Sequence, residues 1–276
     1  MLYVCGTPIG NLEDITLRVL RILKEVDIIA AEDTRQSVKL LNYYDIKTPL
    51  VSYHEHNKDV KGPQLISMLK DGKDIAIVTD AGMPGISDPG EDLIKLCYEN
   101  DVEVTVVPGA TAAVTALVLS GLNARSYIFE GFLPKNKKQR KEVLLKTKSE
   151  TRTLVFYEAP HHLISTLEDL CQYCGNRNSA VIRELTKKHE TVEKGKLEEL
   201  LQYFKDNEPK GEFVIVIEGA NPMDIKEEKT MLFESMTIKE HFDNYVKQGL
   251  DEKSAMKAVA KDRGLGKREV YNEVKK

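Results

Sequence analysis

The sequence predicts an α/β fold made of two lobes, followed by a small helical appendage. Three observations support this prediction. At 276 residues the chain exceeds the size at which one hydrophobic core usually suffices. Strand-like apolar runs alternate with helical patterns along the first two hundred residues. The pattern is interrupted near residues 121–126 and again within "GANPMDIKEEK". We therefore expect an N-terminal lobe at 1–121, a second lobe at 122–222 and the appendage at 223–276.

The alternation of elements predicts mostly parallel sheets. Nine short runs are expected to be strands: "LYVCG", "DIIAAE", "PLVSYH", "DIAIVTD", "VEVTVVPG", "YIFEGF", "TLVFYEAP", "AVIREL" and "EFVIVIEG". Between them lie stretches with the helical period, among them "ITLRVLRILKEV", "QLISMLKDG", "DLIKLCYEN" and "AVTALVLSGL". Strands that alternate with helices are typical of crossover units, and these place strands in parallel.

The end of the chain has a different pattern. The segments "MTIKEHFDNYVKQG", "DEKSAMKAVAKDRG" and "GKREVYNEV" are amphipathic at helical spacing and are separated by glycines. They predict three short helices, an arrangement similar to a helix-turn-helix module.

Composition argues against a membrane protein or an exported one. No run of about 18 apolar residues is present, and the first residues enter a strand-like segment without a basic leader. We expect a cytoplasmic chain with no membrane partner. Its four cysteines do not form a disulfide framework at this length. Cys171 and Cys174 fit one face of a helix, which predicts a buried pair, with a metal or redox site as the alternative.

The stretch "SYHEHN" offers the residue types of a metal site. If it continues the preceding strand, alternation sends His54 and His56 to one face and Glu55 to the other. No third ligand follows nearby, so we predict a contact at the rim of a site or with a substrate, and no metal.

Charge is distributed unevenly. The formal net charge is −4, which argues against a wholly basic nucleic-acid coat. Residues 135–152 nevertheless hold eight Lys or Arg against two acids, and residues 229–276 hold eleven against eight. Two local basic regions on an acidic body predict a polyanion docked at particular places, with an ordinary solvated helix as the alternative for each region.

The ends of the predicted strands share an unusual composition. "GTPIGN", "AEDTR", "TDAGMPGISDPG", "VPGAT" and "YEAPHH" are rich in Gly, Pro and small residues. Ligands of open α/β sheets bind outside the carboxyl ends of the strands. Neither the Walker spacing nor a GxGxxG opening a helix is present. A nucleotide-like ligand held mainly by backbone groups is therefore predicted.

These motifs resemble the tetrapyrrole methylase superfamily. The resemblance rests on "TPIGNLEDIT", "AEDTR", "TDAGMPGISDPG", "VPGATA", "FYEAPHH", "RELTKKHE" and "KGEFVIVIEG", which span nearly the whole chain. Within the superfamily they are most similar to the branch that methylates a cytidine 2′-hydroxyl of small-subunit ribosomal RNA. Thr79 stands where Ser is expected, and His162 stands where Arg is common.

The resemblance implies an S-adenosylmethionine-dependent enzyme, usually a homodimer, with the cofactor in a cleft between the two lobes. Carried onto this chain, it implies a set of residues lining that cleft: Pro8, Asp80, Ala81, Gly82, Pro84, Gly85, Pro108, Gly109, Ala110, Thr111, Ala159 and Pro160.

Transfer of a methyl group to a ribose hydroxyl benefits from a base that accepts the hydroxyl proton. The candidates are the carboxylates that follow strands: Asp33 and Glu184, which are favoured as base or orienting groups, and Glu32. The basic residues predicted to contact phosphate or ribose are Arg35, Arg183, Lys187, Lys137, Lys138 and Arg140. Mixed runs of this kind also form salt bridges between lobes, and that alternative stays open.

Together these features predict S-adenosylmethionine-dependent 2′-O-methylation of a cytidine in small-subunit (16S) ribosomal RNA, with naked RNA or an assembled subunit as the substrate. Two alternatives remain: a small-molecule methylase of the tetrapyrrole type, and a non-catalytic RNA-binding assembly factor. A nicotinamide oxidoreductase is disfavoured because its glycine fingerprint is missing.

Overall fold

The computed structural model describes residues 1–275, except for the side chains of Glu228 and Lys229. The side chain of Lys229 and the whole of Lys276, both counted in the predicted basic tail, thus lie outside what is described. Contacts divide the chain into two compact units. The large unit comprises Met1–Lys148 and Arg152–Glu218, and the C-terminal unit comprises Ser149–Thr151 and the chain from Gly219 onward.

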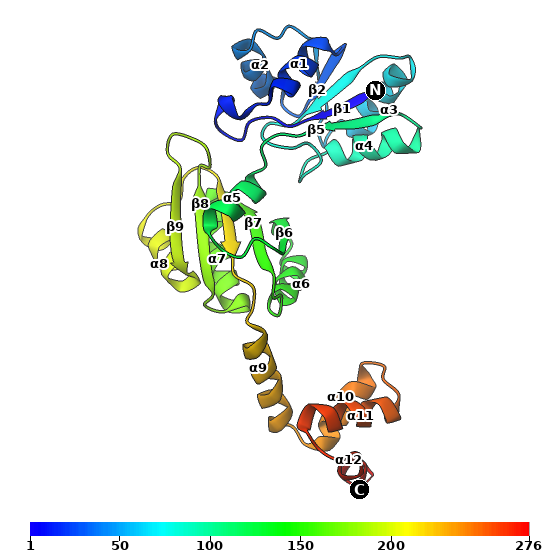
Figure 1. The fold of residues 1–276 in the computed structure, drawn as a ribbon, viewed down its shortest axis with the longest axis vertical. Coiled ribbons are helices and arrows are strands. Elements are labelled where there is room, and N and C mark those ends of the chain that lie inside the picture. Colours follow the sequence, from blue (N-terminus) through cyan, green and yellow to red (C-terminus); the bar gives the residue numbers. More distant parts are fainter. Residues whose placement is uncertain (276) are drawn as a thin grey trace. The chain divides into compact units, whose positions relative to one another are not determined.

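The large unit begins with a five-stranded sheet whose strands are all parallel (Figure 1). The strand order is β3-β2-β4-β1-β5. The strands are β1 (Leu2–Cys5), β2 (Ile28–Ala31), β3 (Leu50–Ser52), β4 (Ile75–Val78) and β5 (Val104–Val107). The three central strands β2, β4 and β1 consist almost wholly of buried residues, as expected of a sheet covered on both faces.

Helices cover both faces of this first sheet. The elements are a 3-10 turn η1 (Leu12–Asp14), α1 (Leu17–Glu25), α2 (Thr34–Tyr43), α3 (Lys58–Lys70) and α4 (Gly90–Glu99). Side chains of α1 and α2 pack on one face of the sheet, and side chains of α3 and α4 pack on the other. Strand and helix alternate along the chain, which confirms the predicted α/β architecture.

The second sheet is mixed. Its order is β6-β7-β10-β8-β9, and within the described chain only the β6–β7 pair is parallel. The strands are β6 (Tyr127–Phe132), β7 (Thr153–Glu158), β8 (Asn178–Arg183), β9 (Thr191–Lys196) and β10 (Phe213–Ile217). Five of the eight strand pairs in the described chain are parallel, so the sheets are mostly parallel taken together.

Strand β9 is absent from the nine predicted strands. Its sequence, "TVEKGK", carries charges and no apolar run, which suits an edge strand in which no residue is fully buried. Charged residues on an edge strand discourage pairing with another chain, and they also hide the strand from a search for hydrophobic runs.

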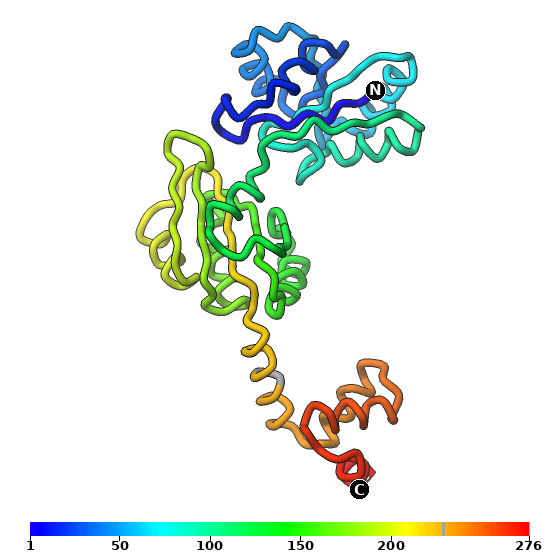
Figure 2. Tube along the Cα trace, viewed as in Figure 1, coloured from blue at the N-terminus to red at the C-terminus, as the bar shows by residue number. Residues whose placement is uncertain are grey.

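One helix covers one face of the second sheet, and three cover the other. Helix α5 (Ala112–Ser120) packs against β7, β8 and β10. Figure 2 shows that the chain leaves the first sheet after β5 and enters this helix on its way to the second sheet. Helices α6 (Lys137–Thr147), α7 (Pro160–Cys174) and α8 (Leu197–Asp206) pack on the opposite face. Cys171 and Cys174 lie in the last turn of α7 as free thiols, with Cys174 buried and Cys171 half-buried.

The C-terminal unit consists of helices around its own small core. They are α9 (Pro222–Ser235), α10 (Ile238–Lys247), α11 (Glu252–Arg263) and α12 (Lys267–Val274). Helices α10 to α12 correspond to the three predicted helices, and Phe242, Val259 and Val270 lie in their core. The expected interruption at Pro222 is instead the first residue of α9, the helical position where a missing N–H costs nothing. The boundaries predicted at residues 121 and 222 stay a prediction.

No helix within residues 1–275 combines the length and the apolar character needed to cross a bilayer.

Candidate active site

A cavity of about 460 Å³ lies in the large unit, at the carboxyl ends of the first sheet. Residues that follow β2, β4 and β5 line one side, and the other side comes from the ends of β7 and β8 and the start of β10. The lining residues are Ile9, Glu32, Thr79, Asp80, Ala81, Gly82, Met83, Ile86, Ser87, Asp88, Thr111, Ala112, Phe132, Tyr157, Glu158, Ala159, Pro160, Ile182, Leu185, Glu212, Phe213 and Val214.

The loop 79–90 is folded back on itself by the carboxylate of Asp88. This carboxylate accepts hydrogen bonds from the backbone N–H groups of Gly85, at 2.9 Å, and Gly90, at 2.8 Å. Gly82 and Gly85 both have φ of 86°, a left-handed conformation that glycine adopts without strain. The sequence of this loop therefore specifies one irregular path, and residues 79–83 and 86–88 of it line the cavity.

The first loop of the chain is bound to loop 79–90 by main-chain contacts. Thr7 and Gly82 exchange N–H to O hydrogen bonds at 2.8 and 3.2 Å, and the Thr7 hydroxyl donates to the carbonyl of Thr79. The loop after β5 lies equally close, because a Cβ added at Gly6 or at Gly109 would collide with the backbone of the other. Three strand ends thus pack as one surface.

Two carboxylates, Glu32 and Asp80, face this cavity from neighbouring strands. The Thr79 hydroxyl donates to Glu32 at 2.7 Å, and the Asp33 N–H donates to Asp80 at 3.1 Å. Loss of hydration raises the pKa of Asp80 above its ordinary value, and the nearby charge of Glu32 adds to the rise. The Asp80 side chain remains accessible to a ligand.

Asp33, the next residue after Glu32, does not line the cavity. It caps α2 by accepting from the backbone N–H of Arg35, and it holds the Arg35 guanidinium through two further bonds of 3.0 and 2.6 Å. These bonds lower the pKa of Asp33 to about 2. A carboxylate with so low a pKa is a weak base, and the Arg35 side chain is engaged with it.

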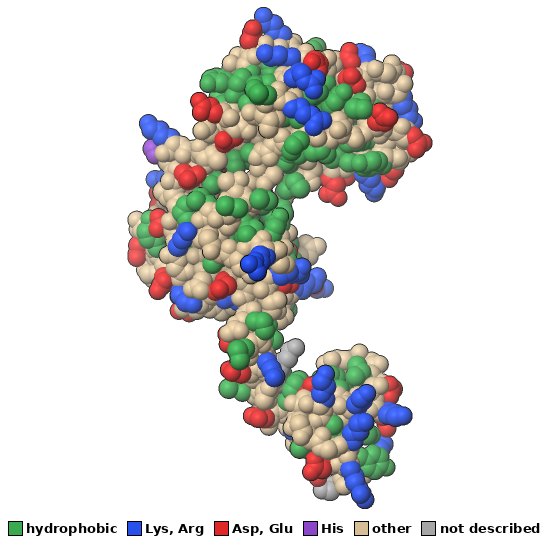
Figure 3. All heavy atoms as spheres, viewed as in Figure 1, with side chains coloured by type: hydrophobic (Ala, Val, Ile, Leu, Met, Phe, Trp, Pro, Cys, Tyr) green, Lys and Arg blue, Asp and Glu red, His purple; other side chains and the backbone are tan. Residues whose placement is uncertain are grey.

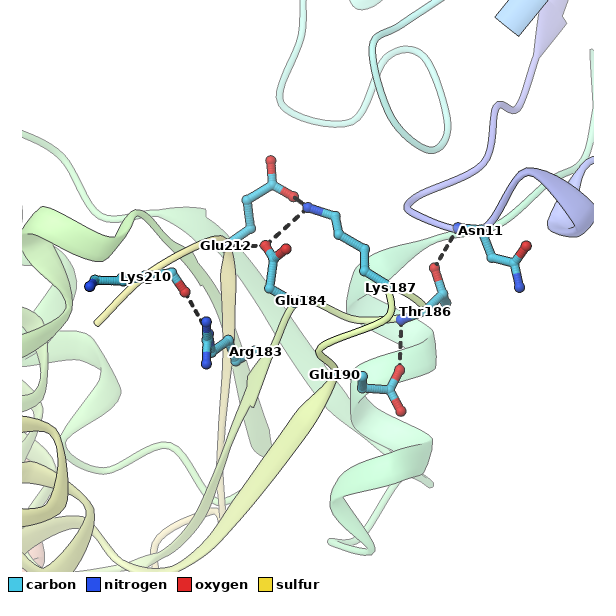
Figure 4. Close-up of polar contacts among 8 residues, drawn as sticks. All are labelled: Asn11, Arg183, Glu184, Thr186, Lys187, Glu190, Lys210 and Glu212. Atoms are coloured by element: carbon cyan, nitrogen blue, oxygen red, sulfur yellow. Dashed lines mark hydrogen bonds and ion pairs between the residues drawn. The ribbon is translucent and has the colours of Figure 1, made fainter. Parts of the chain in front are cut away.

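Glu184 forms a charged cluster beside the cavity (Figure 4). Its carboxylate accepts from Lys187 Nζ at 3.0 Å and from the Glu212 backbone N–H at 2.9 Å, and Lys187 also contacts the Glu212 carboxylate at 2.8 Å. Burial alone would raise the pKa of Glu184, but these hydrogen bonds outweigh it, so the pKa lies below its ordinary value. Gly211 has a φ of 91°, a conformation that favours glycine, and a Cβ there would displace the Glu184 side chain.

The loop that carries Lys187 contacts the first loop of the chain. Figure 4 shows Thr186 directed at Asn11, whose N–H donates to the threonine hydroxyl at 3.0 Å. A Cβ at Gly10 would collide with Thr186 and Lys187. The cluster around Glu184 therefore fixes the loop after β8. This loop contacts the loop after β1 and so connects the two sheets. Arg183 points away from the cluster and donates to the carbonyl of Lys210.

Residues 1–201 match the family profile described as Tetrapyrrole (Corrin/Porphyrin) Methylases. The chain belongs to the tetrapyrrole methylase family. A methylase-fold enzyme of known structure, titled uroporphyrin-III-C-methyltransferase from Thermus thermophilus, superposes with a TM-score of 0.55 over 78% of this chain and 93% of its own, at 22% identity.

Two sequence relatives of this tetrapyrrole methylase are much closer in identity, and both are named ribosomal RNA small subunit methyltransferase I. The relative from Halalkalibacterium halodurans is 50% identical over 98% of this chain and 93% of its own. The relative from Thermotoga maritima is 46% identical over 218 residues, which are 79% of this chain and 98% of its own.

The cleft residues implied by the tetrapyrrole methylase resemblance fall into two groups. Those on the cavity wall are Asp80, Ala81, Gly82, Thr111, Ala159 and Pro160. The others, which shape the loops without lining the cavity, are Pro8, Pro84, Gly85, Pro108, Gly109 and Ala110. Glu32 alone of the three predicted catalytic carboxylates is on the wall.

Several cavity residues were not singled out from the sequence, chiefly Ile9, Phe132, Tyr157, Ile182 and Val214. They are apolar or aromatic, and in the sequence they are indistinguishable from core positions of strands. Only the family pattern next to them, as in "FYEAPHH", gave a signal.

The predicted basic contacts lie apart from this cavity. Lys137 and Arg140 line a second, larger hollow beside α6 and α7, and Lys138, on the same helix, does not. Arg140 is paired with Asp169 at 2.5 Å.

The histidines of "SYHEHN" are not on a strand. Strand β3 ends at Ser52, and residues 55–57 form a turn, so the alternation argument does not apply. No group of three or more His, Cys, Asp or Glu suited to a metal gathers within residues 1–275. His161 and His162 follow Pro160 in the first turn of α7, with ring centroids 4.2 Å apart.

Proposed function

We propose that this protein is an S-adenosylmethionine-dependent methyltransferase that methylates the 2′-hydroxyl of a cytidine in small-subunit ribosomal RNA. The observation that supports the substrate most directly is the name shared by relatives at 46–50% identity that this chain covers over 93–98% of their length. Ribosomal subunits as substrate would place the protein in the cytoplasm.

The residues of the cavity fit the proposed cofactor. A volume of about 460 Å³ lies within the range of roughly 300–1,000 Å³ typical of small-molecule sites. Apolar side chains such as Ile9 and Val214 offer a wall for an adenine ring, and the Asp80 carboxylate offers a partner for a cationic or hydroxyl group. When bound, S-adenosylmethionine supplies an activated methyl group on a sulfonium. Backbone of loop 79–90 would hold it in one orientation, which is where much of the rate advantage of such a transfer arises.

Glu32 is the proposed proton acceptor. One of its oxygens accepts from the Thr79 hydroxyl, which orients the carboxylate, and the side chain borders the cavity. Asp33 and Glu184 hold Arg35 and Lys187 instead, so we assign them positioning roles.

A methyl-transfer assay with labelled S-adenosylmethionine distinguishes this function from the two alternatives, a small-molecule methylase and a non-catalytic RNA-binding factor. The enzyme is incubated with labelled S-adenosylmethionine and unmethylated small ribosomal subunits or naked small-subunit RNA, and the modified nucleoside is mapped. Label on a cytidine ribose is expected, and label on a base contradicts the 2′-hydroxyl assignment.

A small-molecule methylase is the first alternative, since the uroporphyrin enzyme shares the fold. At 22% identity that likeness extends to the fold alone. Methylation of a uroporphyrin-type substrate with indifference to RNA would favour it. Absence of heat in calorimetry with S-adenosylmethionine would favour a non-catalytic RNA-binding factor.

We also propose a homodimer that uses the outer face of α5. Val114, Val118 and Leu119 are 44, 70 and 36% exposed on this helix, an apolar face beside the cavity. Sedimentation should give twice the monomer mass, and Val118→Asp should give the monomer. A monomeric parent protein would contradict the proposal.

A further inference from the structure

A second hollow of about 1,030 Å³ lies between the start of α6 and the start of α7, and we call it the α6–α7 groove. It adjoins the cavity of the candidate active site, because Phe132, Glu158 and Ala159 line both.

The basic residues of the groove differ in whether an acidic side chain compensates their charge. Arg140 is bound to Asp169 and to the Thr166 hydroxyl, so its charge is already compensated. Lys135, Lys137 and Lys141 are exposed, and they form no ion pair with any side chain that the structure describes. Lys137 and Lys141 are four residues apart on α6 and therefore share one face of the helix.

The acids of the groove do not cancel these lysines. Glu168 is paired with Lys205 at 2.8 Å, and Asp169 is paired with Arg140. Glu158 is 6% exposed, and its two oxygens accept from the Ala159 N–H and the Thr166 hydroxyl. The uncompensated charge of the groove is therefore positive.

An exposed aromatic ring stands where the groove meets the cavity. Phe132 is 56% exposed, although its ring contacts Tyr157 with the centroids 5.6 Å apart. Unstacked bases of single-stranded RNA bind such rings. Lysines that track phosphates beside an aromatic ring are the combination that binds a single strand.

We propose that the α6–α7 groove binds the single-stranded RNA segment next to the target nucleotide. Lys135, Lys137 and Lys141 bind its phosphates, and Phe132 stacks a base at the entrance to the cavity. This inference rests on the proposed function, because it takes RNA as the substrate of the adjoining cavity.

Helix α6 also supplies a matched control. Lys138 and Lys146 are exposed on the same helix, and neither lines the groove. The phosphate contact expected of Lys138 from the sequence is therefore not part of this proposal. Lys137→Glu/Lys141→Glu and Lys138→Glu/Lys146→Glu therefore make the same change of charge, one inside the groove and one outside it. Both are made in the full chain, and unchanged melting and unchanged heat of S-adenosylmethionine binding confirm that each variant is folded.

Binding of a short fluorescent oligocytidine RNA is measured by anisotropy at several salt concentrations. The groove variant should bind roughly tenfold or more weakly than the parent, and its slope of log affinity against log salt should fall by about 1.4, or about 0.7 for each lost phosphate contact. The control variant should keep the parent's slope. Equal losses in the two variants, or no loss in the groove variant, would overturn the proposal.

The stacking contact has its own test. Phe132→Ala should weaken binding of the same RNA about tenfold, the effect of losing one base stack, whereas Phe132→Tyr should bind as the parent does. Equal binding of the RNA by Phe132→Ala and by the parent would show that Phe132 does not stack on a base.

Failure of this inference is distinguishable from failure of the proposed function. If the parent transfers methyl to RNA and the groove variant has the same KM as the control variant, the groove is not the RNA site and the function stands. If the parent binds oligocytidine through the groove lysines and methylates no RNA, the groove stands and the proposed function fails.

Discussion

At the scale of residues, adjacent carboxylates in one motif have different environments. Glu32 borders the cavity, and Asp33 caps α2 and holds Arg35. Successive side chains at a strand end point in different directions, so only one of the two faces the ligand. Sequence reasoning placed both at a strand end and favoured Asp33 as a base or orienting group, because the motif does not show which of the two side chains points toward the cavity.

Substitution of Glu32 should therefore affect catalysis selectively. We expect Glu32→Gln to lower kcat by about 10²–10⁴-fold, the usual contribution of a positioned base, with the affinity for S-adenosylmethionine nearly unchanged. The measurement is single-turnover methyl transfer together with calorimetry.

Asp33→Asn is the control, because Asn is as good a helix cap as Asp. It should retain most of the rate. A larger loss of rate for Asp33→Asn than for Glu32→Gln would reverse the assignment.

The pKa of Glu184 lies below its ordinary value near 4.5, and this gives a second prediction. A carboxyl whose pKa is lowered by folding stabilises the folded state above its unfolded pKa, and that contribution is lost as the pH falls through the folded pKa. The free energy of unfolding should therefore decrease on acidification below about pH 4.5.

Glu184→Gln keeps the acceptor oxygen without the charge. At neutral pH it should cost about 1–2 kcal/mol, and its stability should fall less steeply in acid. Urea denaturation at several pH values measures both effects. Parallel pH profiles for the variant and the parent would exclude Glu184 as the source.

At the scale of elements, the loop 79–90 is shaped by few contacts. The Asp88 carboxylate accepts hydrogen bonds from the backbone of Gly85 and Gly90, and the backbone of Thr7 forms two hydrogen bonds with that of Gly82. Residues of the same loop line the cavity, so the order of the loop before binding determines how much conformational entropy a ligand must remove.

Asp88→Ala should accordingly weaken S-adenosylmethionine binding about tenfold, equivalent to about 1.4 kcal/mol of ordering. Asp88→Asn keeps an acceptor and should bind nearly as the parent does. Equal losses in both variants would mean that the charge of Asp88, and not its acceptor role, matters. Calorimetric titration supplies the affinities.

At the scale of the whole molecule, all residues lining the cavity belong to the large unit. The Thermotoga maritima relative aligns over 218 residues, which are 79% of this chain and 98% of its own. The C-terminal unit has its own core, and its Lys and Arg side chains are spread over the face seen in Figure 3.

A chain that stops after Glu218 should therefore fold and keep the affinity of the full chain for S-adenosylmethionine within about a factor of three, since no wall of the cavity is removed. Thermal melting with and without the cofactor checks this. Loss of the cofactor-induced shift in the shortened chain would show that the C-terminal unit is needed to build the site.

The sequence by itself determined the α/β class, the first sheet and the three terminal helices. Strands whose residues are buried on both faces are unbroken apolar runs, and amphipathic helices carry their period in the sequence. It also determined that Gly- and Pro-rich strand ends would gather, because carboxyl ends of parallel strands lie at one edge.

Only the tertiary structure decided the rest. The edge strand β9 has no apolar signal, and the antiparallel pairing of β10 with β8 brings Glu212 to Glu184 across 28 residues. Arg140 pairs with Asp169, a residue 29 positions later in the chain, and this pair compensates the charge of Arg140. The charges of Lys137 and Lys141 in the groove stay uncompensated. A side chain's partner depends on which distant segments of the chain pack beside it, and this packing cannot be predicted from the local sequence.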